Sequence, residues 1–169
     1  MSWDCELVDC KGETLKLKEK HNLKGGTYAM GGTDDCWLNV TYNYGQYIRE
    51  CPDFPDGLDS LQDKVAVDTV QMFDNAIEFL NKKYKKNGRW IVRDREMTYF
   101  RNPTTGVMCS YFDMSPDKLG EWQSVKVTEQ ISEGQNSNYW LATAGNVIKA
   151  LKNLRYLADK KPYGVWHIC

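Results

Sequence analysis

The segment "CWLNVTYNYG", residues 36–45, alternates apolar and polar side chains and predicts a half-buried β-strand. The apolar side chains that share one face of this strand are Leu38, Val40 and Tyr42. The opposite face carries short, uncharged hydrogen-bonding side chains, called here the uncharged row: Asn39, Thr41 and Asn43. Strand faces in contact with water usually carry Lys, Glu or Arg, whereas an enclosed polar site penalises charge. We therefore expect Asn39 and Asn43 to point inward, toward the start of the last helix.

Segments on either side of this strand predict further β-structure. Residues 2–18 alternate around the turn "DCKGE" and predict a hairpin, and residues 88–112 predict strands on both sides of the turn "RNPTTG". The glycine pairs at 25–26 and 31–32 are typical of turns that flank a strand, and they lack the Gly-Lys-Ser/Thr of a phosphate loop. The polar stretch 115–138 predicts a long loop.

Two longer segments have the apolar periodicity of amphipathic helices. The first spans about 63–83, and its apolar stripe is Ala66, Val70, Phe73, Ile77 and Leu80. The second begins near Thr143, ends before Pro162 and has the stripe Val147, Ile148, Leu151, Leu154 and Ala158. The resulting order of elements is β, β, β, α, β, β, α. We predict an α+β fold, a single domain in which two principal helices pack on a mainly antiparallel sheet.

Composition argues against several classes of protein. The chain has 169 residues, and 22 basic residues nearly balance 23 acidic ones. This balance disfavours nucleic-acid binding and also an acidic mimic of DNA. No apolar run approaches the roughly 20 residues of a membrane span, and the acidic opening "MSWDCELVDC" lacks the apolar core of a signal peptide. We expect a protein of the cytoplasm without a membrane partner.

Residue types used in catalysis and metal binding occur without recognisable spacing. His21 and His167 belong to no H-E-x-x-H or H-x-E motif, and no G-x-S-x-G elbow occurs. Cys5, Cys10 and His21 could form a loose metal cluster, but reduced, scattered thiols are the simpler interpretation of six cysteines without a C-x-x-C pair. We predict no catalytic residue, no metal and no cofactor, and an Asp- or Glu-based activity stays open.

A group of binding residues can be named instead. The uncharged row lies among flat rings, which are those of Tyr28, Trp37 and Tyr44. A donor-rich helix start follows at Thr143, Gly145 and Asn146. Rings suit stacking, neutral amides suit base or sugar edges, and helix N–H groups suit a phosphate. These residues together predict a site for a nucleotide-like small molecule. Interior polar networks and helix caps are the alternative, because many domains that bind nothing contain them.

Four motifs give the chain a resemblance to a known family. They are "MSWD", "GGTYAMGGTDDCWLNVTYNYG", "GLDSL…VDTVQMFDNAI" and "YWLATAGNVIKAL…KKPYGVW". The chain resembles a family of small bacteriophage and prophage proteins with M-S-W-D, G-G-T before L-N-(V/I)-T-Y-N-Y, and a Y-W-x-x-T-x-G-N helix. The resemblance implies a phage or prophage origin and no particular activity. Residues 85–130 look like an insertion into this pattern. The shared motifs include six predicted site residues: Asn39, Thr41, Asn43, Thr143, Gly145 and Asn146.

A phage origin suggests two functions in the host cytoplasm. In the first, the protein counters host defence by sequestering a nucleotide-like signal without turning it over. In the second, it inhibits a host defence protein, such as a CRISPR effector, through the aromatic side chains of the inserted segment, which are Trp90, Tyr99, Phe100 and Tyr111. A virion or assembly protein is a further class, and a homo-oligomer stays open.

Overall fold

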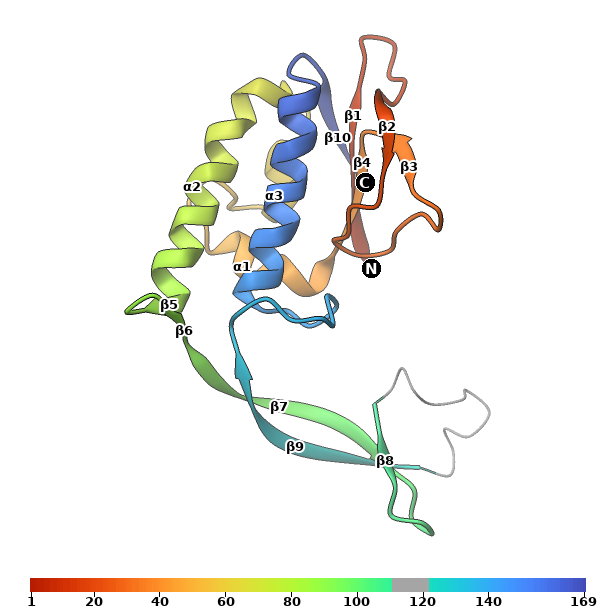
Figure 1. Ribbon diagram of the computed structural model, residues 1–169, viewed down its shortest axis with the longest axis vertical. Helices are drawn as coiled ribbons and strands as arrows, with labels where there is room; N and C mark the ends of the chain where they lie inside the picture. Colours follow the sequence, from red (N-terminus) through yellow and green to blue (C-terminus); the bar gives the residue numbers. More distant parts are fainter. Residues whose placement is uncertain (111–121) are drawn as a thin grey trace. The chain divides into compact units, whose positions relative to one another are not determined.

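The computed structural model describes residues 1–110 and 122–169, which adopt the α+β fold predicted from the sequence. The chain divides into two compact units (Figure 1). The main unit comprises Met1–Ile91 and Glu133–Cys169, and the ribbon unit comprises Val92–Ser132. The ribbon unit falls largely within the segment that the sequence marks as an insertion, 85–130. Tyr111, one of the predicted partner-binding residues, lies outside the described residues.

Antiparallel strands form the central sheet of the main unit. Its order is β10–β1–β4, with β10 at Val165–Ile168, β1 at Ser2–Val8 and β4 at Trp37–Thr41. Cys5 on the central strand pairs with Ile168 on one side and Leu38 on the other. Residues Cys5 and Leu7 of β1 are fully buried, because alternate side chains of this strand face the helices.

The predicted hairpin at 2–18 is only partly right. The Leu15 N–H donates to the Leu7 carbonyl at 2.8 Å, so the chain does turn back along β1. It then leaves β1, and β2 (Lys16–His21) pairs with β3 (Thr33–Asp35) in a second, two-stranded sheet. Alternation in 16–21 correctly indicated a strand but could not select its partner, because pairing depends on residues far along the chain.

Three α-helices accompany the central sheet: α1 at Gly45–Arg49, α2 at Ala66–Tyr84 and α3 at Ala144–Lys160. Short 3₁₀ helices occupy Tyr42–Tyr44 and Gly57–Leu61. Figure 1 shows α2 and α3 side by side on one side of the sheet. Both long helices agree with the predicted stripes, since Phe73 and Leu80 of α2 and Leu151 and Leu154 of α3 are completely buried.

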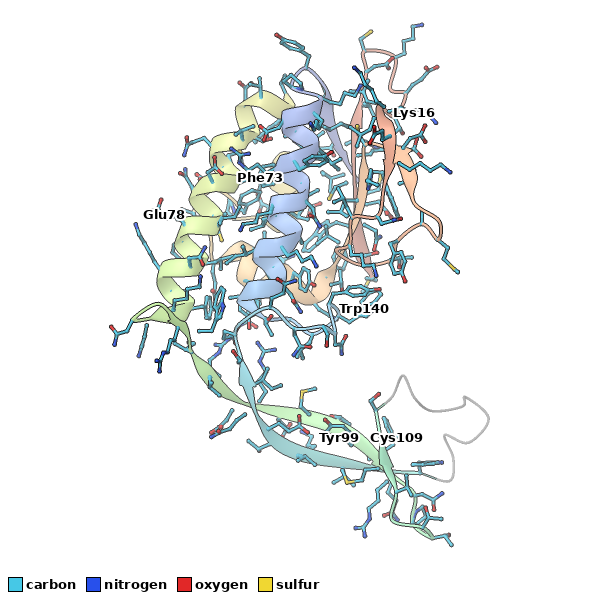
Figure 2. All side chains as sticks on the ribbon, viewed as in Figure 1. Lys16, Phe73, Glu78, Tyr99, Cys109 and Trp140 are labelled. Carbon is cyan, nitrogen blue, oxygen red and sulfur yellow. The ribbon has the colours of Figure 1, made fainter. Side chains whose placement is uncertain are left out.

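The core lies between these helices and the sheet. Phe73, labelled in Figure 2, points inward from α2, whereas Glu78 of the same helix points outward. The Phe73 ring centre is 6.1 Å from that of Trp166 on β10 and 5.7 Å from that of Phe54. The Trp166 indole N–H donates to Thr69 Oγ1 at 3.0 Å, which satisfies its polar atom inside the core.

The predicted strand at 36–45 ends earlier than its alternation suggests. Thr41 Oγ1 accepts the Asn43 N–H at 3.3 Å and caps the 3₁₀ helix that starts at Tyr42. The uncharged row is therefore interrupted, because only Asn39 and Thr41 belong to β4. Asn43 is exposed, so the prediction that it points inward is wrong.

The ribbon unit contains two long antiparallel strands. Strands β7 (Val92–Arg101) and β9 (Gln123–Ser132) pair along their full lengths, and the short β8 (Met108–Cys109) pairs with the far end of β7. The predicted loop at 115–138 is therefore wrong over 123–132. Its polar side chains misled the interpretation, because both faces of this ribbon retain solvent access except at Ile131. Residues 85–90 form a separate hairpin in the main unit, with β5 at Lys85–Lys86 and β6 at Arg89–Trp90.

Candidate functional site

Asn39 belongs to a closed internal network. Its side chain is 4% exposed and donates to Ser2 Oγ at 2.8 Å and Asp4 Oδ1 at 2.9 Å, while its Oδ1 accepts the Thr27 N–H at 2.7 Å. Trp37 also donates to Asp4 Oδ1, at 3.0 Å. These bonds join β1, β4 and the glycine turn instead of reaching the last helix. Asn39 is buried as predicted, but its partners differ from those we expected.

Gly26 is required by this network. A Cβ atom at Gly26 would lie 2.3 Å from Asn39 Oδ1, far inside van der Waals contact. The glycine turn therefore passes directly over the Asn39 amide, and the Thr41 N–H donates to the Gly25 carbonyl at 3.1 Å. The glycine pair at 25–26 thus permits close packing against β4, which agrees with a turn and not with a phosphate cradle.

The end of the uncharged row reaches the loop that precedes α3. The exposed Asn43 amide donates to the Trp140 carbonyl at 3.1 Å, and the Tyr44 hydroxyl donates to the Tyr139 carbonyl. Burial, with a smaller effect from Tyr139, raises the pKa of Tyr44 well above its ordinary value. The Tyr44 hydroxyl consequently stays neutral and acts as a fixed donor to this loop.

A buried carboxylate caps the start of α3. Glu133 is completely buried; its Oε2 accepts the Ala144 N–H at 2.9 Å, and its carbonyl accepts the Gly145 N–H at 2.8 Å. The Tyr47 hydroxyl lies 2.9 and 2.8 Å from the two carboxylate oxygens. Thr143 Oγ1 accepts the Asn146 N–H at 3.2 Å, which confirms the predicted cap.

The expected phosphate position is consequently occupied by the protein itself. Glu133 places its carboxyl oxygens at the positive end of α3, where we expected a ligand anion. The predicted partners of these N–H groups, Asn39 and Asn43, bond elsewhere. The N–H groups of Ala144, Gly145 and Asn146 are all engaged within the chain, so we no longer assign a phosphate to them.

Two residues at the helix start position the preceding loop. A Cβ at Gly145 would lie 2.2 Å from the Gln135 nitrogen, so only glycine allows the loop to cross here. Asn146 Oδ1 accepts the Asn136 N–H at 2.9 Å, and its amide donates to the carbonyls of Asn138 and Leu141 at 3.1 and 2.9 Å. Asn146 thereby holds residues 136–141 against α3, which makes its role positional.

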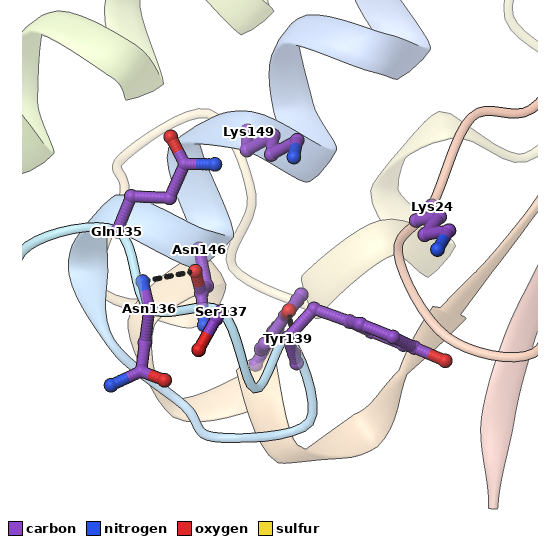
Figure 3. Close-up of a pocket in the computed structure, with 8 residues that line it drawn as sticks. Lys24, Gln135, Asn136, Ser137, Tyr139, Asn146 and Lys149 are labelled. Atoms are coloured by element: carbon purple, nitrogen blue, oxygen red, sulfur yellow. Dashed lines mark hydrogen bonds between the residues drawn. The ribbon is translucent and has the colours of Figure 1, made fainter.

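A pocket of about 380 Å³ opens beside this loop (Figure 3). We call it the loop–helix pocket, and its lining residues are Lys24, Tyr44, Gln135, Asn136, Ser137, Tyr139, Asn146 and Lys149. Tyr44 and Asn146 are the predicted site residues that line it. Tyr28 is adjacent, since its ring centre is 6.3 Å from that of Tyr139. The remaining predicted site residues do not line the pocket; they are Trp37, Asn39, Thr41, Asn43, Thr143 and Gly145.

The pocket combines positive charge with aromatic and neutral polar groups. Lys24 Nζ lies 4.3 Å from the Tyr28 ring centre and 5.8 Å from that of Tyr139. Lys149 supplies a second ammonium from α3, and Gln135, Asn136 and Ser137 supply uncharged donors and acceptors. None of its lining residues is acidic. Such a surface favours a small anion that also carries a flat ring.

Most of the lining residues were missed by the sequence interpretation. Lys24 was not among the predicted site residues, and 135–138 fell within the predicted loop, 115–138. An available signal was the uncharged run "GQNSNYW" directly before the predicted helix cap, since loops held against a helix start often form binding sites. Lys149 could be recognised as a lining residue only from the packing of α3 beside this loop.

The aromatic residues predicted to bind a protein belong to both units, and the two on β7 do not share a face. Trp90 belongs to the main unit, where Lys85 Nζ lies 4.3 Å from its ring centre. Tyr99 and Phe100 are consecutive residues of β7 and therefore project to opposite faces of the ribbon. The Tyr99 hydroxyl bonds to Glu129 Oε1 at 2.6 Å.

Comparisons with protein-family models, curated proteins and solved structures find no match to this chain. The phage-family resemblance therefore stays a prediction. None of the helices in 1–110 and 122–169 is long and apolar enough to cross a membrane. Within the same residues, no three His, Cys, Asp or Glu side chains are grouped so that they could hold a metal ion.

Proposed function

We propose that this chain is a binding protein that holds a small nucleotide-like ligand in the loop–helix pocket without turning it over. The observation that carries the proposal is the combination of Lys24, Lys149 and the Tyr139 ring around one hollow without a lining carboxylate. Its volume of about 380 Å³ is within the range of small-molecule sites, roughly 300–1,000 Å³.

Each chemical part of a nucleotide has a suitable counterpart. Lysine ammonium groups bind phosphate as mobile point charges, and an aromatic face stacks on a base. Gln135, Asn136 and Ser137 offer neutral groups for the edges of a sugar or base. Lys24 already lies over the Tyr28 ring, so a ligand phosphate would meet an ammonium that is held near the pocket.

The proposed absence of turnover rests on the residue types that line the pocket. Its lining contains no histidine, cysteine, aspartate or glutamate that could act as a general base beside Ser137. The phage-family resemblance extends the proposal to a role in the host cytoplasm, where the protein would counter host defence by sequestering a nucleotide-derived signal.

A direct binding experiment tests this proposal. Purified chain is titrated with ADP, ADP-ribose and cyclic AMP by calorimetry, and bound ligand is recovered after denaturation. We expect at least one probe to bind and to return with unchanged mass. Lys149→Glu should weaken binding about tenfold or more, whereas Lys82→Glu, on the exposed side of α2, should not. Failure of all three probes to bind, or recovery of altered ligand, would contradict the proposal.

The ribbon unit supports a second candidate function, inhibition of a host defence protein. Met97 on β7 pairs with Val127 on β9, and Tyr99 pairs with Val125, so four apolar side chains share one face of the ribbon. An isolated two-stranded ribbon is marginally stable in water, and a partner that covers such a face would stabilise it.

Substitution on that face tests the second candidate. Immobilised full-length chain is used to capture proteins from a host lysate, in parallel with the variants Val127→Lys and Thr128→Lys. A ribbon-bound partner should be lost with Val127→Lys and retained with Thr128→Lys, because residue 128 lies on the opposite face. Equal capture by both variants would exclude this face as the binding surface.

A further inference from the structure

A second pocket adjoins the first one. We call it the hairpin–helix pocket; it has a volume of about 350 Å³ and is lined by Asn81, Lys85, Trp90, Gln135, Gly145, Ile148, Lys149 and Lys152. Gln135 and Lys149 line both pockets, so the two hollows meet at these side chains. All of the lining residues belong to the main unit, whose elements form one compact body.

The second pocket repeats the chemistry of the first. Lys85 Nζ lies 4.3 Å from the Trp90 ring centre, which parallels Lys24 beside Tyr28 and Tyr139. Lys152 follows Lys149 by three residues on α3, so the two ammonium groups lie on the same face of this helix. Again, no acidic side chain is among the lining residues. The Tyr139 ring therefore lines one pocket and the Trp90 ring lines the other, and Lys149 lines both.

We infer that the ligand is a dinucleotide, with one base against Tyr139, the other against Trp90 and the bridging phosphates at Lys149. This inference rests on the proposed function and specifies its ligand class. A mononucleotide would use one ring and leave the other pocket empty. A ligand with two bases and a phosphate bridge would use both rings. Its negative charge would lie beside Lys149 and Lys152, which share one face of α3.

The position of Gln135 supports a single ligand that spans both pockets. Its backbone is held against Gly145, where a Cβ would lie 2.2 Å from the Gln135 nitrogen, and the next residue is bonded to Asn146. The loop therefore has a defined position on α3 at the boundary between the pockets. The uncharged Gln135 amide offers a hydrogen-bonding group there without repelling a phosphate, as a carboxylate would.

Dinucleotide and mononucleotide probes distinguish this inference from the simpler proposal. Cyclic di-AMP and NAD are titrated in parallel with ADP, again by calorimetry on the full chain. We expect at least one dinucleotide to bind with one molecule per chain and about tenfold or more tighter than ADP, because a second stacked base adds its own free energy. Trp90→Ala and Lys152→Ala should each weaken dinucleotide binding about tenfold and leave ADP binding unchanged.

Control variants separate loss of the second pocket from loss of structure. Trp90→Phe keeps a ring and should retain most of the dinucleotide affinity, and Lys160→Ala, farther along α3, should leave it unchanged. Equal affinities for ADP and both dinucleotides, or two ADP molecules per chain, would overturn the inference while the proposed function survives. Tighter binding of a single-stranded decanucleotide would overturn it in favour of a nucleic acid. Binding of none of these probes would overturn both proposals.

Discussion

The main unit and the ribbon unit both contain strands with alternating side chains, but different interactions stabilise the two units. In the main unit, the alternate residues Cys5 and Leu7 of β1 are fully buried beneath two long helices. In the ribbon unit, the alternate residues Met97 and Tyr99 of β7 keep partial solvent access. The former unit is held by an apolar core, and the latter chiefly by ladder hydrogen bonds and cross-strand pairs.

This difference shows where the free energy of unfolding is concentrated. A buried aromatic side chain in a core contributes several kilocalories per mole, whereas a cross-strand pair on a solvated ribbon contributes about 0.2–1 kcal/mol. Substitutions in the main unit should therefore have large effects, and equivalent substitutions in the ribbon unit should have small ones. The following predictions test that contrast in order of expected effect.

The largest effect is expected at Phe73, the α2 residue packed on Trp166 and Phe54. Phe73→Ala should lower the free energy of unfolding by about 3–5 kcal/mol, because it creates a cavity in the core. Urea unfolding followed by circular dichroism measures this change. Val127→Ala in the ribbon unit is the matched control and should lower it by less than about 1 kcal/mol. Similar losses for the two variants would remove the distinction between the units.

The buried cap of α3 should give the second-largest effect. Glu133→Ala should destabilise the main unit by about 2–4 kcal/mol, because it leaves the Ala144 N–H and the Tyr47 hydroxyl without this acceptor. Glu133→Gln retains one oxygen acceptor and should lose less. Urea unfolding measures both variants. If Glu133→Ala were as stable as the parent chain, the carboxylate would not be the cap that determines this helix start.

Alkaline pH should weaken the main unit through its buried thiols. Burial raises the pKa of Cys36 from 9.0 to about 11 and that of Cys51 from 9.0 to about 12. Since the unfolded chain deprotonates first, stability is fully present below pH 9 and is lost progressively as the pH rises from 9 to these folded-state values. We expect each thiol to remove about 1 kcal/mol at pH 10.

Comparison with a variant that lacks these two thiols isolates their effect from that of other titrating groups. Cys36→Ala/Cys51→Ala should show a smaller loss of unfolding free energy between pH 8 and pH 10 than the parent chain. Cys10→Ala, which changes an exposed thiol, should follow the parent. Parallel pH curves for the parent and the double variant would contradict the assignment.

The smallest effect on the main unit is expected from removal of the ribbon unit. The Glu133 N–H donates to the Ile91 carbonyl at 2.9 Å. The two residues of the main unit that flank the ribbon unit are therefore already hydrogen-bonded to each other. Replacing Val92–Ser132 with Asn-Gly, a hairpin turn, should change the unfolding free energy of the main unit by less than about 1 kcal/mol. Calorimetric melting measures this. Loss of cooperative melting would show that the main unit depends on the ribbon unit.

Features determined by nearby residues could be predicted from the sequence. The stripe containing Phe73 and Leu80 indicated α2, and the stripe containing Leu151 and Leu154 indicated α3. Thr143 was recognisable as a cap because its bond to the Asn146 N–H spans only three residues. Helical periodicity and capping depend on contacts within one or two turns, so the amino-acid order records them directly.

Features that depend on distant residues were decided by the tertiary structure. Tyr47 and Glu133 are 86 residues apart in sequence, yet their side chains form a hydrogen bond. The same Glu133 side chain caps α3 at the position where we expected a phosphate. Strand β9 was mistaken for a loop because its pairing with β7 does not require an apolar face. The loop–helix pocket joins Lys24, Tyr139 and Lys149 from three separate segments. The sequence by itself determined which helices and strands could form. Burial and long-range hydrogen bonds determined which side chains meet, because those interactions exist only in the folded chain.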